Sequence, residues 1–144
     1  MKILVPVDGS RYSMEALKVA LDYARIKGAG VDVISVASDA GGIDLEISAG
    51  ERERVRQRME QRADSIMKEA CEVMSKSGVK ADCKVMSTAS SVADAILEYS
   101  EERKTDLIIM GSRGLSPSAS FKMGSVAAQV VKYSDCSVYI VKLP

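Results

Sequence analysis

The sequence predicts an α/β fold: one doubly wound, open, five-stranded parallel sheet with helices on both faces. Short apolar runs of strand length alternate with longer stretches of helical periodicity along the chain. The first run, residues 3–7, is continuously apolar, which suits a central parallel strand that is buried on both faces. Strands that alternate with helices require right-handed crossovers, and these place helices on the two faces of a parallel sheet.

The first crossover begins with a turn at Asp8, Gly9 and Ser10. Ser10 or Ser13 is suited to cap the helix that follows, because a serine hydroxyl accepts a hydrogen bond from a free N–H group of the first turn. The apolar face of this helix runs out near Gly28, and glycine is typical of helix C-termini.

A second strand is expected over residues 31–36, and a long helix over residues 51–77, which Gly78 ends. Residues 38–50 join them as the one sizeable irregular connection. Glu and Arg interleave in the opening turns of the long helix. An anion-binding or partner-binding patch is one interpretation, but interleaved opposite charges favour a solvated helix face.

The remaining elements continue the alternation. Residues 81–85 alternate between apolar and polar side chains and predict a third strand. Ser91 opens a helix as the first residue of a capping-box pattern. Residues 107–110 form the fourth strand, residues 126–133 a helix, and residues 138–141 the fifth strand.

Composition restricts the classes of function. The 144 residues are expected to form one domain, residues 1–144, which is large enough to bury a core. Lys and Arg together number 20, as do Asp and Glu, so the formal net charge is zero. This argues against nucleic acid as a partner, because non-specific binding needs an excess of cations. The N-terminal apolar run is too short for a signal peptide or a membrane span, so we expect a cytoplasmic protein without a membrane partner.

The chain contains no histidine and three widely spaced cysteines, Cys71, Cys83 and Cys136. Without histidine there is no Ser–His or Cys–His nucleophile pair and no imidazole ligand for a metal. The cysteines form no C-x-x-C pair, so we expect buried free thiols rather than a disulfide framework or a zinc site.

A glycine-spaced loop follows the fourth strand and is the most informative motif of the chain. Gly111 and Gly114 come first, and after nine residues Gly124 and Ser125 open the next helix. Glycines let the backbone approach an anion, and the free N–H groups of a helix N-terminus attract negative charge. The spacing G-x2-G-x9-G-[ST] between a strand and a helix therefore predicts a phosphate-binding loop. The alternative is a connection whose glycines serve turns alone.

Together with residues 6–10 and Val36, this loop resembles the ATP-binding type of the universal stress protein family, and the resemblance covers essentially the whole chain. It implies the strand order 3-2-1-4-5, with ligand bound where the order reverses, between strands 1 and 4. Asp8 and the glycine loop should then face one another. It also implies a homodimer that pairs through strand 5, the edge strand at residues 137–141.

The resemblance also implies the residues of an adenine-nucleotide site. Asp8 would accept hydrogen bonds from ribose or adenine, while Val36 and Met110 would give apolar contact to the base. Three glycines and the N–H groups at the start of the last helix would hold the phosphates. The full set comprises Pro6, Val7, Asp8, Val36, Met110, Gly111, Arg113, Gly114, Gly124, Ser125 and Val126.

Each side chain of this set has a structural alternative. Asp8 is also suited to cap the helix after strand 1. Val36 and Met110 would fit a core equally well, and Arg113 would fit a solvated loop. Ser125 is expected to be the N-cap of its helix whether or not it binds phosphate.

One segment departs from the family pattern. Many members carry Gly-x-Pro where this chain has Ser90, Ser91 and Val92. The loop after strand 3 is therefore expected to differ in shape, which affects adenine-side contacts from residues 87–90.

The function that the sequence favours is an ATP-binding regulatory or stress-response module, in which the bound nucleotide sets the conformation or the choice of partner. The alternative is a slow ATPase or phosphotransferase that depends on Mg²⁺ or Mn²⁺. Neither a catalytic residue nor a metal ligand can be assigned, because the site lacks a histidine, a second carboxylate and a G-K-[ST] lysine.

Overall fold

The computed structural model of the protein describes residues 1–38, 48–115 and 123–144. Within these residues, five parallel strands form one sheet in the order β3-β2-β1-β4-β5, which confirms the predicted fold class and strand order. The elements are β1 Lys2–Pro6, α1 Arg11–Lys27, β2 Gly30–Ser38, α2 Ala49–Ser77, β3 Ala81–Thr88, α3 Val92–Glu102, β4 Leu107–Gly111, α4 Ser125–Tyr133 and β5 Ser137–Val141.

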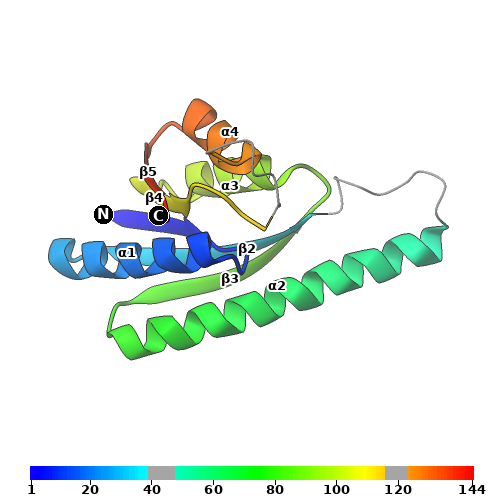
Figure 1. Cartoon of the computed structure of the whole chain (residues 1–144), viewed down its shortest axis with the longest axis horizontal. Coiled ribbons are helices and arrows are strands. Elements are labelled where there is room, and N and C mark those ends of the chain that lie inside the picture. The colour runs from blue at the N-terminus through cyan, green and yellow to red at the C-terminus, as the bar shows by residue number, and fades with distance from the viewer. Residues whose placement is uncertain (39–47, 116–122) are drawn as a thin grey trace.

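The helices cover the two faces of the sheet in pairs (Figure 1). Helices α1 and α2 pack on one face, where Ile3 and Val5 of β1 join the core. Helices α3 and α4 pack on the other face, where the side chain of Leu4 points. Because β1 has helices on both sides, each of these three residues is at most 1% exposed. This arrangement explains why the first apolar run is continuous rather than alternating.

The C-terminal ends of α1 and α2 follow the predicted signals, whereas α2 begins early. Gly28 and Gly78 lie just beyond α1 and α2 with φ of 65° and 74°, left-handed values that favour glycine. Helix α2 begins two residues earlier than predicted, at Ala49. Its N-cap is Ser48, whose hydroxyl accepts from the Glu51 N–H group, while the Glu51 carboxylate accepts from the Ser48 N–H group.

The predicted irregular connection is shorter than expected at both ends. Ser38 belongs to β2, and residues 49–50 belong to α2. The part of the connection over residues 39–47 lies outside the described residues, as does the part of the glycine loop over residues 116–122.

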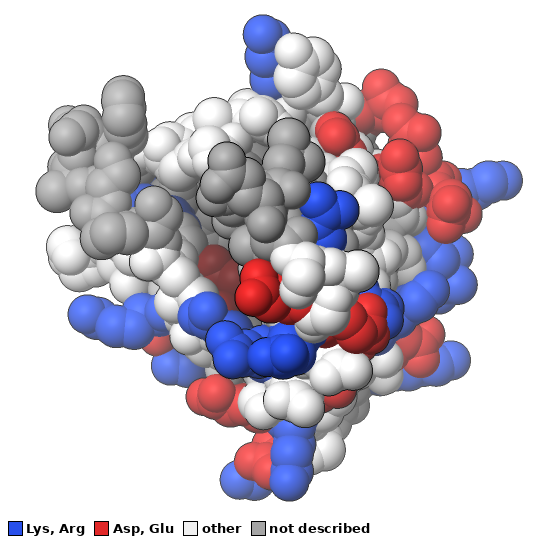
Figure 2. Space-filling view, turned by 90° about the vertical axis from the view of Figure 1, so that its right-hand side faces the viewer, with Lys and Arg blue, Asp and Glu red and all other residues white. Residues whose placement is uncertain are grey.

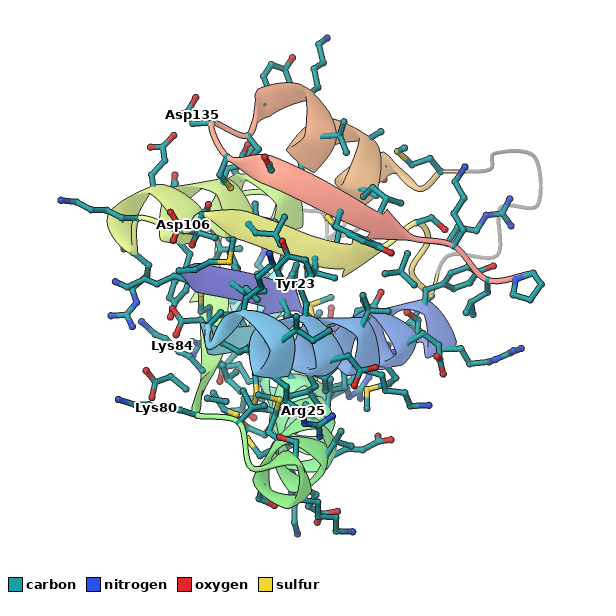
Figure 3. All side chains as sticks on the ribbon, turned by 90° about the vertical axis from the view of Figure 1, so that its left-hand side faces the viewer. Tyr23, Arg25, Lys80, Lys84, Asp106 and Asp135 are labelled. Atoms are coloured by element: carbon teal, nitrogen blue, oxygen red, sulfur yellow. The ribbon has the colours of Figure 1, made fainter. Side chains whose placement is uncertain are left out.

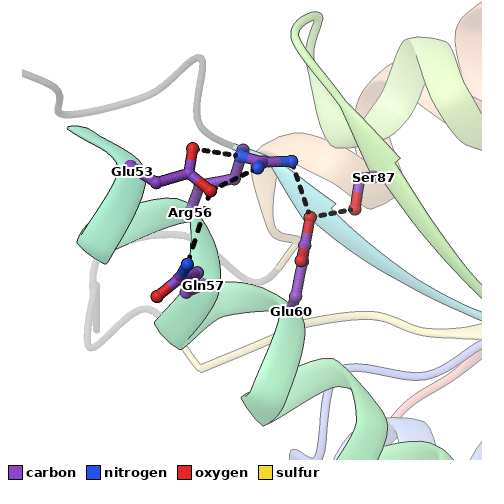
Figure 4. A network of polar contacts seen from close by, with 5 residues as sticks. All are labelled: Glu53, Arg56, Gln57, Glu60 and Ser87. Carbon is purple, nitrogen blue, oxygen red and sulfur yellow. Dashed lines mark hydrogen bonds and ion pairs between the residues drawn. The ribbon is translucent and has the colours of Figure 1, made fainter. Parts of the chain in front are cut away.

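The interleaved charges of α2 pair with one another on an exposed helix face, as predicted (Figure 4). Arg56 donates to Glu53 at 3.0 Å and to Glu60 at 3.2 Å. The Arg56 hydrogen bond lowers the pKa of the Glu53 carboxyl. Glu60 also accepts from the Ser87 hydroxyl at 3.1 Å, which links α2 to β3. Charge pairing on this turn therefore serves local structure.

The amino ends of the strands carry structural polar contacts, on the side that Figure 3 faces. Asp106 accepts from the Lys2 N–H group at 2.7 Å, and Arg25 donates to the Ser77 carbonyl at 3.2 Å. On the same edge, Arg103 donates to Asp32 at 3.1 Å. These contacts join elements that lie far apart in the sequence.

The cysteines differ from the prediction. All three are free thiols, but Cys83 is exposed on β3, and Cys71 and Cys136 are half-buried. The Cys83 side chain sits on the edge strand, where its sulfur is partly shielded. This burial, with a hydrogen bond to the Cys71 thiol, raises the pKa of Cys83 to about 12. In addition, none of the helices in the described ranges is long and apolar enough to cross a membrane.

Candidate functional site

The carboxyl ends of β1 and β4 lie side by side in the sheet, and the chain leaves them toward opposite faces. Strand β1 leads to α1 on one face, whereas β4 leads to α4 on the other. A crevice is expected where parallel strands diverge in this way. A cavity of about 280 Å³ occupies this position. It is lined by Pro6, Val7, Asp8, Ser13, Val36, Val92, Ile96, Met110, Gly111, Arg113, Gly114, Leu115, Gly124, Ser125, Val126 and Ala127.

All eleven residues of the predicted site therefore line one cavity, although they come from four separate parts of the chain. Figure 2 faces this end of the molecule and shows Lys and Arg side chains interspersed with Asp and Glu rather than a patch of one sign.

Asp8 faces the glycine loop, as the strand order predicts. A Cβ atom added to Gly114 would collide with Asp8 Oδ2, so the loop backbone lies directly against the carboxylate. Asp8 Oδ1 accepts from the Ser10 N–H group at 2.9 Å, which fixes the carboxylate in the turn. The remaining oxygen is directed toward the loop and the cavity.

The helix-capping alternative for Asp8 is wrong. The N-cap of α1 is Ser10, whose hydroxyl accepts from the Ser13 N–H group at 3.1 Å. Asp8 precedes the N-cap and supports the turn, while Gly9 provides the left-handed φ of 82° that this turn needs.

The first turn of α4 differs from those of the other helices. Serine side chains cap α1, α2 and α3, but the N-cap of α4 is Gly124, which provides no side-chain cap. The predicted N-cap, Ser125, is wrong by one position, because Ser125 is already the first helical residue. The N–H groups at this helix start thus have no capping side chain and lie at the cavity.

The glycine loop closes onto the start of α4. The Gly124 N–H group donates to the Ser112 carbonyl at 2.7 Å, and the Ser112 N–H group donates to the Val141 carbonyl at 2.8 Å. Ser112 is 2% exposed, so it anchors the loop from within. Gly124 is thereby held beside the backbone of Arg113 and Gly114, where it lines the cavity.

Gly111 has a packing role that the sequence prediction did not include. A Cβ atom at this position would lie 2.6 Å from Tyr12 Cβ and 2.8 Å from the Tyr12 carbonyl carbon. Strand β4 can therefore approach α1 this closely only with glycine at position 111. Gly111 lines the cavity, but its lack of a side chain is explained by this helix contact.

We expect Gly111→Ala to destabilise the fold by about 1–3 kcal/mol, because the added methyl group forces the α1 backbone away from β4. Urea denaturation followed by circular dichroism measures this loss. Gly30→Ala is the matched control, since nothing lies within 4 Å of a Cβ atom there. Equal midpoints for the two variants would contradict the packing role.

Apolar residues form the wall of the cavity opposite the glycines. Met110 is 6% exposed and belongs to the core between the sheet and α3 and α4, and Val36 is half-buried against the same core. These two residues therefore belong to the core and also line the cavity, so contact with a base stays a prediction. Val92 and Ile96 of α3 complete this wall. The predicted site did not include these two residues.

The loop without the Gly-x-Pro pattern is held by hydroxyl groups. The Thr88 and Ser90 hydroxyls lie 2.8 Å apart, and the Ser38 hydroxyl donates to the Ser90 carbonyl at 2.7 Å. Ser91 then caps α3 by accepting from the Asp94 N–H group at 3.1 Å. These contacts fasten β3 and α3 to the end of β2, beside the cavity.

The lining of the cavity contains few charged groups. Among the described residues, Asp8 is the only carboxylate that lines the cavity, and Arg113 is the only cation. The described ranges contain no group of three or more Cys, Asp or Glu residues placed to hold a metal ion. The cavity thus offers backbone N–H groups, one carboxylate and an apolar wall.

Comparison with known proteins agrees with this arrangement. The model of the Universal stress protein family matches residues 1–142. A universal stress protein of Methanocaldococcus jannaschii is 32% identical over 143 residues, which cover 99% of this chain and 82% of that protein. The solved structure of universal stress protein UspA from Lactobacillus plantarum has a TM-score of 0.87 at 20% identity and covers 98% of this chain and 97% of its own, a likeness of fold.

A second solved structure is informative about ligands. It is a universal stress protein in complex with cAMP, with a TM-score of 0.71 and 26% identity, and the match covers 98% of this chain and 96% of that one. The profile match over nearly the whole chain, the identity to the archaeal relative and the shared topology have one explanation. The chain belongs to the universal stress protein family.

Proposed function

We propose that this protein binds one adenine nucleotide per chain, with ATP as the ligand, in the cavity between β1 and β4. The observation that carries the proposal is the first turn of α4. It has no side-chain cap, it opens beside Gly114 and Gly124, and it faces the same cavity as Asp8. A helix start of this kind binds phosphate through its N–H groups and its dipole. A related protein in complex with cAMP supports an adenine nucleotide as the ligand.

In this proposal the cavity is divided by chemistry. The N–H groups of Ser125 and Val126, with the backbone at Gly114 and Gly124, bind the phosphates. Asp8 accepts hydrogen bonds from the ribose hydroxyls or the adenine amino group, which are donors that a carboxylate prefers. The apolar wall receives the base, as is usual for pockets that bind small molecules. A Mg²⁺ or Mn²⁺ ion would be bound through the nucleotide phosphates, since the cavity lining offers a single carboxylate.

The regulatory role follows from the same geometry. The ligand would contact both the loop after β1, which leads to α1, and the loop after β4, which leads to α4. We propose that occupancy thereby sets the conformation of the glycine loop and the choice of protein partner. The alternative, slow ATP hydrolysis, has less support because no second carboxylate is placed to activate water.

The test is calorimetric titration of the full chain with ATP, ADP and AMP at fixed Mg²⁺, followed by chromatography of the nucleotide after incubation. We expect one nucleotide bound per chain, and we expect bound ATP to stay unhydrolysed for many minutes. No heat of binding for any of the three ligands would refute the proposal. Turnover near about 10 s⁻¹, a typical enzyme rate, would replace the binding module with the ATPase alternative.

We also propose that the chain forms a homodimer through β5. This strand is at the sheet edge, its residues alternate between exposed and half-buried, and Tyr139 is 47% exposed. An edge of this kind presents unpaired backbone groups, and a charge on it opposes pairing. We expect light scattering to give the mass of two chains for the wild type and of one chain for Tyr139→Lys. A wild-type mass of one chain at tens of micromolar would contradict the dimer.

A further inference from the structure

A second cavity adjoins the proposed nucleotide site and extends it toward α2. This annex has a volume of about 200 Å³ and shares Asp8, Val36, Val92 and Leu115 with the first cavity. Its other lining residues come from the end of β2 and from one side of α2: Ser35, Ala37, Ser38, Met59, Arg62, Ala63 and Ile66. The shared residues place the two cavities side by side, with the start of α4 at one end and the middle of α2 at the other.

Arg62 is the only cation that lines the annex among the described residues. Its side chain is exposed, and within the described part of the chain it takes part in no hydrogen bond or ion pair. Arg56, which precedes it on α2, is instead held by Glu53 and Glu60 (Figure 4). Arg62 is thus available for a ligand, whereas Arg56 is already engaged.

Arg62 lies away from the start of α4, where the phosphates are proposed to bind, and this position determines which part of a nucleotide it contacts. Gly124 and Ser125 line the first cavity but not the annex, and Arg62 lines the annex but not the first cavity. Asp8 lines both and lies between them. A nucleotide with its phosphates at α4 and its ribose at Asp8 therefore places its base on the part of the apolar wall formed by Val36 and Val92, which line both cavities, so that the base borders the annex.

We propose that Arg62 binds the base of the nucleotide by packing its guanidinium group against the purine ring. The inference rests on the proposed function and names a residue that sets affinity for the base. Val36, Met59 and Ile66 all line the annex and offer apolar contacts to a flat ring bound there. A planar guanidinium packs on such a ring, and it does so better than the point charge of a lysine. Small-molecule pockets usually exceed about 300 Å³, a size that the first cavity reaches only together with the adjoining annex.

The experiment compares Arg62→Ala and Arg62→Lys with the wild type in titrations with ATP and with adenosine at 0.15 M salt, a concentration that screens distant charges. We expect Arg62→Ala to weaken both ligands by the same factor, about 3-fold to 10-fold, because both contain the base. Arg62→Lys should restore little of the loss. Arg58→Ala is the control, because Arg58 lies one turn away on the same exposed helix and lines neither cavity.

Each contrary outcome is distinct. Unchanged affinity for Arg62→Ala, in a wild type that binds ATP, overturns the role of Arg62 and leaves the proposed function intact. A loss for ATP that exceeds the loss for adenosine, full rescue by Arg62→Lys, or an equal loss for Arg58→Ala assigns the effect to charge and overturns the packing on the base. If the wild type binds neither ATP nor adenosine, the proposed function is wrong, and so is the role of Arg62.

Discussion

Gly124→Val is expected to weaken ATP binding by at least about tenfold without a comparable loss of stability, which would make it the most selective change in the protein. The backbone at position 124 is extended, with φ −71° and ψ 162°, a conformation that valine favours. A Cβ atom there would lie 3.5 Å from the Ser112 carbonyl oxygen and 3.6 Å from the Arg113 Cα atom, which are ordinary contacts. The side chain would nevertheless fill the space through which phosphate approaches the N–H groups of α4.

Calorimetric titration of Gly124→Val with ATP gives the affinity, and urea denaturation of the same protein gives the stability. Gly124→Ala, with its smaller side chain, should fall between the wild type and valine. Gly30→Val is the matched control at the opposite end of the sheet, where a Cβ atom meets nothing within 4 Å. Wild-type affinity in folded Gly124→Val would show that phosphate does not bind at this helix start.

Asp8→Ala should produce the second large effect, a loss of about 10-fold to 150-fold in ATP affinity. A hydrogen bond to a charged group contributes about 1.5–3 kcal/mol, and each 1.4 kcal/mol corresponds to tenfold in affinity. The carboxylate faces Gly114 and lies at the junction of the two cavities, where no other acid in the described residues lines the wall.

Asp8→Asn separates the ligand role from the role in the turn. Its amide oxygen can still accept from the Ser10 N–H group, a bond of 2.9 Å in the wild type, so the turn before α1 should persist. The negative charge is removed, and affinity for ATP should fall although the midpoint of thermal unfolding stays near that of the wild type. If Asn and Ala both leave affinity unchanged, Asp8 belongs to the turn alone.

The order of strands and helices was predictable because residues within each segment determine where that segment begins and ends. Gly28 and Gly78 adopt the left-handed conformation that ends a helix, and the apolar run of β1 reflects burial on both faces. The juxtaposition of Asp8 with the glycine loop followed once the strand order was assumed, since adjacent parallel strands bring their carboxyl ends together. The Ser48–Glu51 capping box was also present in the sequence as Ser-x-x-Glu, but it was not used.

Other features depend on packing that the sequence does not state. The glycine at position 111 is required by the approach of Tyr12, a residue about a hundred positions away in the chain. Arg62 lies beyond the opening turns of α2 in which Glu and Arg interleave, and nothing in the sequence marks it as a site residue. The crossing of α2 over the end of β2 brings Arg62 to the annex, while Arg56 pairs with two glutamates. The error at Ser125 was conformational, because serine at a helix start is equally suited to the cap and to the first helical position.

Because α4 has no side-chain cap, binding of a nucleotide at its N-terminus would contribute to the stability of the fold. Serine side chains cap α1, α2 and α3, so the first turns of these helices need no bound ligand as a cap. For α4, a bound phosphate would act as the cap and accept the hydrogen bonds that no side chain of the protein accepts there. A ligand that binds only the native state adds about 2.7 kcal/mol of stability at one hundred times its dissociation constant. The concentration of nucleotide in the cell would then set how long each copy of this protein survives unfolding and proteolysis, so that abundance itself would report the energy state of the cell.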